Sequence, residues 1–326
     1  MPLLKIDING RRIGSPRKPP LAMLRAALAN KQPEAPVVIL IHGYKFSPRD
    51  PRYTPHAHIL SLDPTTGRAH ATSWPRKLGV GAGSEERPES DMPEPLCIAL
   101  GWEARGSFRA AYRVAPDAGH ALARLIRLLH RLTGGQPVDL MAHSLGARVA
   151  LSALPALPAG AVGRIILLAP AELQSCAKTW LDCAAGRAAQ TLNVTSGENL
   201  LFDRLLEWIV APHRWGERAM GADCTQHMDH WTTLRIDDPA CRAALSRLGF
   251  AIPPPDRRIC HWSVYQRRGL FKLYRAILSG RLGFAELRAE LRAEVLTQDP
   301  VAGQNRTQTW GWGLVSDATK TPPTDA

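Results

Sequence analysis

One serine in the sequence stands where its hydroxyl would be exposed for chemistry. The apolar run PVDLMAHS ends at Ser144, and the stretch ARVALSAL begins three residues later with the composition of a helix, so the serine lies at a predicted strand-to-helix turn. The small residues Ala142 and Gly146 let such a turn pass close to its neighbours. Because the helix begins directly after the turn, its free N–H groups and positive dipole end favour a developing oxyanion. The pattern predicts a nucleophilic serine, and a plain helix N-cap is the alternative interpretation.

Cysteine and histidine offer one candidate metal site. Cys224, His227 and His230 in DCTQHMDH have spacings that a zinc site can use, but no fourth ligand is evident nearby. The six cysteines include no Cys-x-x-Cys pair, and a chain of this length does not need disulfides to build a core. We therefore expect no metal and no other cofactor, and we expect most cysteines to be buried thiols.

The elements that must position Ser144 alternate along the chain. Continuous apolar runs rich in β-branched residues predict strands buried on both faces: PVVILIHGY (36–44), LCIALGW (96–102), PVDLMAHS (137–144), RIILLAP (164–170) and TLNVTS (191–196). Helical patterns lie between them at 117–132, 147–154, 176–185 and 202–210. Strands alternating with helices of this length indicate βαβ units. The predicted fold class is α/β, with a mostly parallel sheet and helices on both faces.

The edges of this sheet are less well defined by the sequence. Residues 3–8 alternate apolar and charged side chains before Asn9-Gly10, which predicts an edge strand entering a hairpin turn. The segments 232–237 (TTLRID) and 257–262 (RRICHW) both fit a last strand.

The domain organisation follows from composition. We expect a single catalytic domain over residues 1–300 and a flexible C-terminal tail over residues 301–326, which are polar and rich in Thr, Pro and Gly. Residues 46–94 are rich in proline and charge without periodicity, which predicts long loops near the site.

The strand, the serine and the helix together resemble the nucleophile elbow of the α/β-hydrolase superfamily. The motif is Ala142-His143-Ser144-Leu145-Gly146, with alanine at its first position where the pattern usually has glycine. The segment LGWEARGSFRAAYRVAPDAG is similar to a poorly characterised bacterial branch of that superfamily. The resemblance covers roughly residues 36–280 and implies the α/β-hydrolase fold.

The resemblance also implies an oxyanion hole. VVILIHGYKFSP is similar to the family's His-Gly segment, in which the loop after a strand donates one N–H group to the oxyanion. The implied donors are the backbone N–H groups of Tyr44 and Leu145, and His42 and Gly43 would shape the loop.

Serine is a poor nucleophile at neutral pH unless an imidazole takes its proton. His261, in RRICHWSVY before the helical stretch GLFKLYRAIL, stands where the family places its catalytic histidine. His230, in HMDHW, is the alternative base. His143 points away from the serine in most elbows, so we expect it to pack or hydrogen-bond locally.

The imidazole needs a carboxylate that fixes its tautomer and stabilises the imidazolium. The family places this acid just past the strand TLNVTS. Glu198 fits that loop position and is our first choice. Asp203 is the alternative acid, although it also fits the first turn of a helix, where it would complement the dipole.

The implied function is that of a serine hydrolase, esterase- or lipase-like, which hydrolyses a carboxylic or lipid-like acyl ester through an acyl-enzyme on Ser144. Leu205, Leu206, Trp208, Ile209 and Trp215 would form an apolar wall or lid, or pack as an ordinary helix. Two alternatives are a catalytically inactive binding or scaffold protein with this fold and an acyltransferase that uses the same triad. The sequence leaves the oligomeric state undetermined.

Charge and hydropathy exclude further classes. The net charge of +12 comes from 41 basic and 29 acidic residues, and several arginines alternate with Glu in FAELRAELRAEVL, as on a solvated helix face. No nucleic-acid-binding signature is present, so we expect no nucleic-acid partner. Peripheral contact with an anionic membrane, or steering of an acidic substrate, is the functional alternative to a generally basic surface. Without an 18-residue apolar run, and with Lys5 and Asp7 in place of a signal peptide, we expect a cytoplasmic protein without a transmembrane segment.

Overall fold

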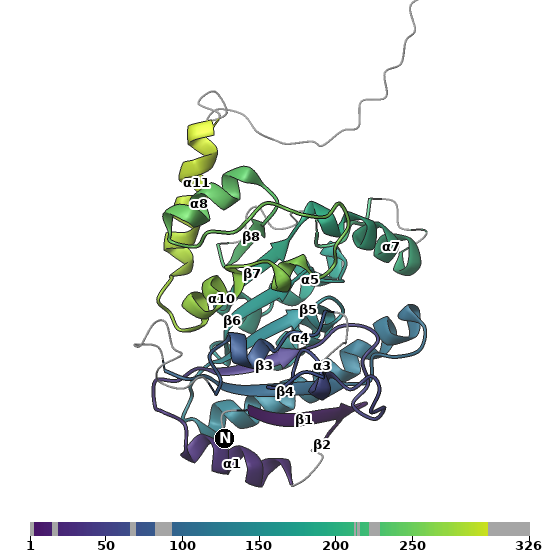
Figure 1. Ribbon diagram of the computed structural model, residues 1–326. Helices are drawn as coiled ribbons and strands as arrows, with labels where there is room; N and C mark the ends of the chain where they lie inside the picture. Colours follow the sequence, from purple (N-terminus) through teal and green to yellow (C-terminus); the bar gives the residue numbers. More distant parts are fainter. Residues whose placement is uncertain are drawn as a thin grey trace, which may run out of the picture.

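The computed structural model describes residues 3–14, 19–65, 70–81, 93–211, 213, 216–221 and 229–298. Eight strands form one sheet in the order β2-β1-β4-β3-β5-β6-β7-β8 (Figure 1). They are β1 (Leu3–Asn9), β2 (Arg12–Gly14), β3 (Val37–Ile41), β4 (Leu96–Trp102), β5 (Val138–His143), β6 (Val162–Leu168), β7 (Gln190–Thr195) and β8 (Trp231–Arg235). All neighbouring strands are parallel except the β1–β2 hairpin. The mostly parallel sheet predicted from the sequence is confirmed.

The helices connect these strands. They are α1 (Pro20–Ala29), α2 (Trp74–Lys77), α3 (Phe108–Leu132), α4 (Gly146–Ala153), α5 (Gln174–Leu181), α6 (Ala184–Ala188), α7 (Leu200–Val210), α8 (Pro239–Arg247), α9 (Ser263–Gln266), α10 (Leu270–Leu278) and α11 (Phe284–Gln298). Short 3-10 turns cover Pro55–Ala57, Leu154–Ala156 and Gly197–Asn199. None of the described helices combines the length and apolarity needed to cross a bilayer.

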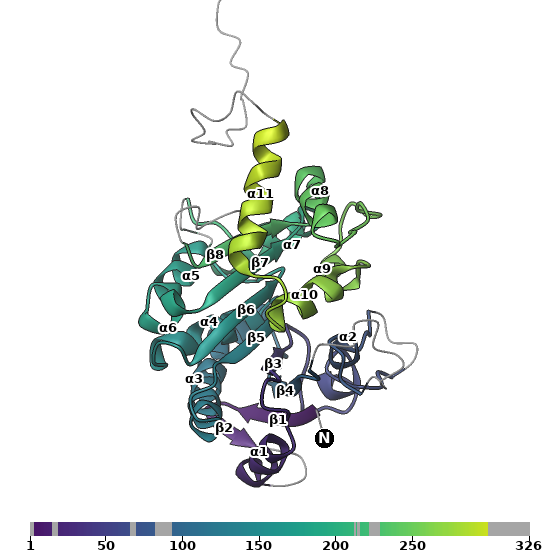
Figure 2. The ribbon, with the colours of Figure 1, turned by 90° about the vertical axis from the view of Figure 1, so that its left-hand side faces the viewer.

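Two apolar layers enclose the sheet because strand side chains alternate between its faces. In β3, Val37, Ile39 and Ile41 join the cluster that includes α3, α4 and α5, whereas Val38 and Leu40 join the cluster that includes α2, α8 and α10. Figure 2 shows α3, α5 and α6 on one side of the sheet and α2, α9 and α10 on the other. Burial on both faces explains why the strands read as continuous apolar runs.

The structure decides between the two candidates for the last strand and moves the start of one helix. The segment 257–262 forms no strand, and β8 is the last strand of the described sheet. The long helix α3 begins at Phe108 rather than near Asp117, because the Ser107 hydroxyl accepts a hydrogen bond from Ala110 N and caps it there.

The described part of the region 46–94 consists of turns and loops with two short helical segments, Pro55–Ala57 and α2. This part places Ile59, Leu60, Trp74 and Val80 in the core against one face of the sheet. This packing anchors the described loops against the sheet. The tail expected over 301–326 lies outside the described residues.

The direction of the strands decides where a site can form. Because β3 to β8 are parallel, the loops that follow β3, β5, β6 and β7 all leave the same edge of the sheet. Ligand sites in open α/β sheets form at this carboxyl edge, and Ser144 follows β5 there.

Candidate active site

Ser144 occupies a strained turn between β5 and α4. Its φ is 53°, a left-handed conformation that non-glycine residues seldom adopt. The turn is clamped by the loop after β6: Ser144 N donates to Leu168 O at 2.9 Å, and Ser144 O accepts from the N–H groups of Ala147 and Ala171 at 3.0 Å each. Strain that the surrounding structure holds in place is characteristic of functional positions.

Two glycines allow the elbow to pack this closely. A Cβ atom on Gly43 would lie 2.8 Å from Ser144 Cβ and 3.0 Å from His143 O. A Cβ atom on Gly146 would lie 2.6 Å from His42 O and 2.8 Å from Ile41 O. Neither position can carry a side chain without moving backbone. Ala142, in contrast, lies within β5 and is fully buried, so the alanine in place of glycine is accommodated.

The loop of residues 42–44, here called the oxyanion loop, is fixed by a buried histidine. His42 Nδ1 lies 2.8 Å from Gly43 O, and its Nε2 accepts a hydrogen bond from Trp102 N at 3.0 Å. The indole N–H of Trp102 donates to His42 O, and the two rings stack. Burial lowers the pKa of His42 to about 3. His42 is therefore a neutral structural residue, protonated at Nδ1.

The two expected oxyanion donors flank the serine. Neither Tyr44 N nor Leu145 N has an acceptor among the residues that the structure describes. The Tyr44 hydroxyl donates to Gly106 O at 2.6 Å, which anchors the end of the oxyanion loop. Unpaired backbone donors beside a candidate nucleophile are what an oxyanion hole requires.

His261 lies beside the elbow, in the loop before α9. Its carbonyl oxygen lies 3.2 Å from Nε2 of His143, the residue before Ser144, and the two imidazole rings are 4.7 Å apart. The phenyl ring of Phe202, a residue of α7, lies 4.7 Å from the His261 ring. Burial lowers the pKa of His261 well below its usual value, and the neighbouring His143 lowers it further. The imidazole is therefore neutral.

An amide holds the other side of this imidazole. His261 Nδ1 lies 2.6 Å from Asn199 Oδ1, and Asn199 Nδ2 donates to Asp203 Oδ1 at 2.9 Å. Since the amide N–H is used toward Asp203, the amide oxygen faces His261 and the proton resides on Nδ1. Nε2 of His261 then carries the lone pair that a general base needs. We call these three residues the His261–Asn199–Asp203 relay.

Asp203 is buried at the end of this relay. Burial raises the pKa of Asp203 to about 7, while the Asn199 hydrogen bond opposes that rise. A Cβ atom on Gly221 would lie 2.0 Å from Asp203 Oδ2, so the bare backbone of Gly221 lies against the carboxylate.

Glu198 has a different set of partners from the one expected. Its carboxylate accepts hydrogen bonds from the Ser196 hydroxyl, at 2.9 Å, and from the buried guanidinium of Arg267. Its backbone oxygen accepts from Cys260 N at 3.0 Å. Glu198 thus positions the loop that carries His261 through its main chain, whereas the adjacent Asn199 contacts the imidazole.

His143 connects the serine turn to the loop that carries His261. Its ring packs edge-on against Trp74 and Tyr265, and burial lowers its pKa to about 4. Its side chain bonds to the His261 carbonyl, which lies 118 positions away in the chain.

His230 lies at the opposite edge of the sheet. It precedes the first residue of β8, and its carbonyl oxygen accepts from Thr191 N at the start of β7. Strands of five to seven residues span about 17–20 Å, so a histidine at the amino edge cannot reach Ser144 at the carboxyl edge. The alternative base is excluded by the sheet direction.

The segment with the zinc-like spacing extends beyond the described residues. They contain no group of three or more His, Cys, Asp or Glu side chains suited to hold a metal ion. Cys224 and His227 lie outside the described residues, as does Trp215 of the expected apolar wall.

A buried ionic network supports the loop after β6. Glu172 accepts hydrogen bonds from the Tyr112 hydroxyl, from Arg148 at 2.6 Å and from Leu173 N at 2.7 Å. The Arg148 guanidinium lies 3.7 Å over the Tyr112 ring. This network joins α3, α4 and the loop that clamps Ser144, and sequence analysis identified none of its charged members.

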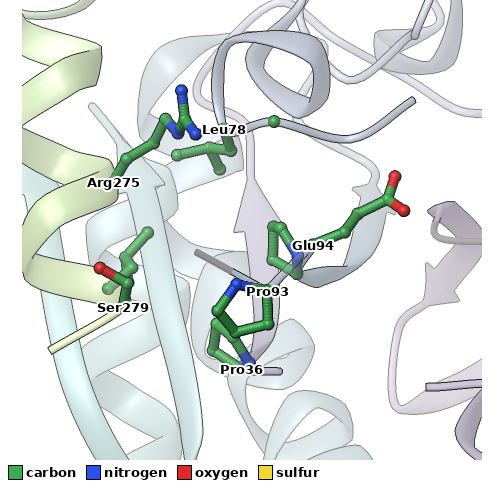
Figure 3. A pocket seen from close by; sticks show the side chains of 9 residues that line it. Pro36, Leu78, Pro93, Glu94, Arg275 and Ser279 are labelled. Carbon is green, nitrogen blue, oxygen red and sulfur yellow. The ribbon is translucent and has the colours of Figure 1, made fainter. Parts of the chain in front are cut away.

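Cavities at the amino edge of the sheet lie away from this chemistry. One, of about 20 Å³, is lined by Pro36, Glu94, Arg275 and Ser279 among others (Figure 3). Pro36 directly precedes β3, so the cavity lies at the edge opposite Ser144. Its volume has room for about one water molecule.

Comparisons with known proteins agree with this fold. Residues 22–171 match a family described as alpha/beta hydrolase of unknown function (DUF900). This segment includes the oxyanion loop and Ser144 but not Asn199 or His261. No curated protein has a significantly similar sequence.

Three lipolytic proteins are among the solved structures that match this chain at low identity. Mature lipase BlEst2 of Bacillus licheniformis has 13% identity and a TM-score of 0.33, over 52% of this chain and 68% of that chain. Phospholipase PlaB of Legionella pneumophila has 16% identity and a TM-score of 0.33, over 53% and 40%. Lipase B of Aspergillus fumigatus has 14% identity and a TM-score of 0.38, over 89% and 69%.

Proposed function

We propose that this chain, which has the α/β-hydrolase fold, is a serine hydrolase that cleaves small carboxylic or lipid-like acyl esters. The observation that carries the proposal is Ser144 at φ 53°, with unpaired backbone N–H groups at Leu145 and Tyr44 and with the neutral imidazole of His261 packed against the ring of the adjacent His143. An N-cap serine needs none of these neighbours.

The proposed reaction starts with attack of Ser144 Oγ on the ester carbonyl carbon. His261 Nε2 takes the hydroxyl proton as general base. The N–H groups of Tyr44 and Leu145 donate to the oxyanion that forms. When the tetrahedral intermediate collapses, the C–O bond to the alcohol breaks and His261 returns the proton to the leaving oxygen. Water then attacks the acyl-enzyme, and His261 takes a proton from it. When the second tetrahedral intermediate collapses, the bond to Ser144 Oγ breaks and His261 returns the proton to that oxygen.

The orienting role falls to Asn199 in this proposal, in place of Glu198. Its 2.6 Å contact with Nδ1 fixes the His261 tautomer, as the amide does in Cys-His-Asn proteases. Asp203 orients Asn199 in turn: its carboxyl group accepts a hydrogen bond from the Asn199 amide N–H, which leaves the amide oxygen facing His261. Glu198 is assigned to the loop, through Arg267 and Cys260.

A fluorophosphonate probe tests the proposal directly. The folded wild-type protein should be labelled, and labelling should vanish in Ser144→Ala, whose circular dichroism spectrum serves as the folding control. The same pair should differ in cleavage of short-chain p-nitrophenyl esters. A folded protein that is neither labelled nor hydrolytic would contradict the proposal and favour a binding protein. Products formed with added alcohols would separate hydrolysis from acyl transfer.

A further inference from the structure

One helix beside the site exposes an unusual amount of apolar surface. Four of the large apolar side chains exposed on the described surface belong to α7, which has eleven residues. They are Leu200, Leu201, Leu205 and Trp208, and Trp208 is 72% exposed. Clusters of exposed apolar residues mark interaction surfaces, whereas single ones are ordinary.

A fifth exposed residue lies close to the start of this helix. Ile259 is 55% exposed. The next residue, Cys260, donates its N–H to Glu198 O at 3.0 Å, directly before the first turn of α7. We call Leu200, Leu201, Leu205, Trp208 and Ile259 together the docking face. Figure 1 shows α7 at the periphery of the molecule, far from α1.

The charges around the docking face are mostly cationic. Arg257 and Arg258 precede Ile259 and are exposed, with no ion-pair partner among the described residues. Asp256 is the one acidic residue in the adjoining loop segment 253–259. At the other end of α7, the exposed Arg109 donates to Ile209 O at 2.6 Å.

The carboxylates of α7 have protein partners instead. Asp203 is buried against Asn199, and Glu207 accepts from Ala219 N at 2.9 Å and pairs with Arg204. The helix therefore presents leucines and a tryptophan outward, its acidic groups are paired within the protein, and the unpaired cations come from the adjoining loop.

We infer that the docking face binds the surface of an anionic lipid bilayer. A short helix with an apolar face and cationic flanks lies in the plane of a membrane interface, with its apolar side chains inserted, and tryptophan favours that interface. Anionic headgroups would pair with Arg257 and Arg258, and the net charge of +12 adds long-range attraction. A second copy of this chain would instead bring the same arginines against each other, which is unfavourable.

The docking face lies close to the candidate active site. Phe202, between Leu201 and the buried Asp203, packs on the His261 ring, so a bilayer bound to the docking face lies next to the candidate catalytic histidine. That lipid acyl esters are the substrates rests on the proposed function; the membrane binding itself does not.

Vesicle sedimentation tests the inference without depending on hydrolysis. The full chain carrying Ser144→Ala should sediment with vesicles of phosphatidylcholine and phosphatidylglycerol, and much less with phosphatidylcholine alone. Adding Trp208→Ala should lower the partition coefficient roughly tenfold. The double variant Arg257→Gln/Arg258→Gln should lower binding to the anionic vesicles and reduce its dependence on salt. Leu21→Ala on α1, which removes a side chain 41% exposed, is the matched control and should bind as the parent does.

Several results would overturn the inference. These are absence of binding to both vesicles, equal binding to neutral and anionic vesicles, or equal losses for Trp208→Ala and Leu21→Ala. A monomer–dimer equilibrium in light scattering that Trp208→Ala abolishes, without vesicle binding, would make the docking face an interface between copies. Vesicle binding by a protein that fails the fluorophosphonate test would leave this inference intact and contradict only the proposed function.

Discussion

His261 is held by an amide rather than by a carboxylate, because its Nδ1 atom lies 2.6 Å from Asn199 Oδ1. The two residues are 62 positions apart and meet where the loop after β7 lies against the loop before α9. The carboxyl group that a triad normally supplies lies one hydrogen bond further from the imidazole, in Asp203.

Asn199 should therefore control the protonation and orientation of His261. Asn199→Ala should lower kcat/KM by roughly 10²-fold or more, since the imidazole loses its fixed tautomer. Asn199→Asp places a carboxylate beside the imidazole and should raise the pKa of His261, which moves the acidic limb of the kcat/KM profile to higher pH. The pH profiles of the two variants measure both effects. Wild-type activity in Asn199→Ala, or an unshifted limb in Asn199→Asp, would show that this contact has no role in the reaction.

Alanine substitutions of the two histidine candidates should have different effects on ester cleavage. His261→Ala should lose ester cleavage by orders of magnitude, because the general base is removed. His230→Ala should keep it, since His230 lies at the amino edge of the sheet. Initial rates on a p-nitrophenyl ester, with Tm as the folding control, decide between them. An inactive but folded His230→Ala variant would refute the assignment.

A methyl group at Gly43 should damage the oxyanion hole. The added Cβ would approach Ser144 Cβ to 2.8 Å, so the oxyanion loop must move away from the serine. Gly43→Ala should lower kcat by roughly 10²-fold, the size of effect seen when an oxyanion donor is lost. Gly283→Ala is the matched control, since its added Cβ would have no atom within 4 Å. Equal rates in the two variants would mean that the oxyanion loop does not serve the reaction.

Asp203 should make the protein less stable as the pH rises. Burial raises its pKa from 3.8 to about 7, so the folded state binds this proton more tightly than the unfolded state does. The resulting stabilisation is complete below pH 3.8 and is lost as the pH rises to about 7. Asp203→Asn mimics the protonated acid at every pH. Its free energy of unfolding should exceed that of the wild type above pH 7, by on the order of a few kcal/mol, and approach it near pH 4. A difference between the two proteins that does not change with pH, in urea denaturation, would contradict this.

Glu198 should matter for stability more than for chemistry. Glu198→Gln leaves the buried Arg267 guanidinium without its counter-charge, which should cost roughly 3 kcal/mol or more. Asp182→Asn breaks an exposed ion pair with Arg187 and should cost less than about 1 kcal/mol. Denaturant unfolding of both variants measures the contrast. A stable Glu198→Gln variant with a large loss of kcat would return Glu198 to the role of the triad acid.

The sheet was predictable because its signals are local. Continuous apolar runs such as PVVILI and LCIALGW fill strands that are buried on both faces, and each became a strand of the parallel sheet. The last strand could not be chosen between 232–237 and 257–262 on that basis, because both segments carry similar side chains. The structure places the second segment across the carboxyl edge, where Cys260 bonds to Glu198.

The sequence by itself determined the serine turn: the strand, the small residues around Ser144 and the helix are contiguous, so their geometry follows from local packing. Tertiary structure alone decided which polar groups surround it. Whether Glu198, Asn199 or Asp203 reaches His261 depends on how a 3-10 turn directs three nearby side chains, and their spacing in the chain does not specify this. Asn199 also carries an uncharged amide, whereas the triad acid is expected to be a carboxylate. The direction of β8, set by its pairing with β7, likewise removed His230 from the site although its sequence context resembled that of a base.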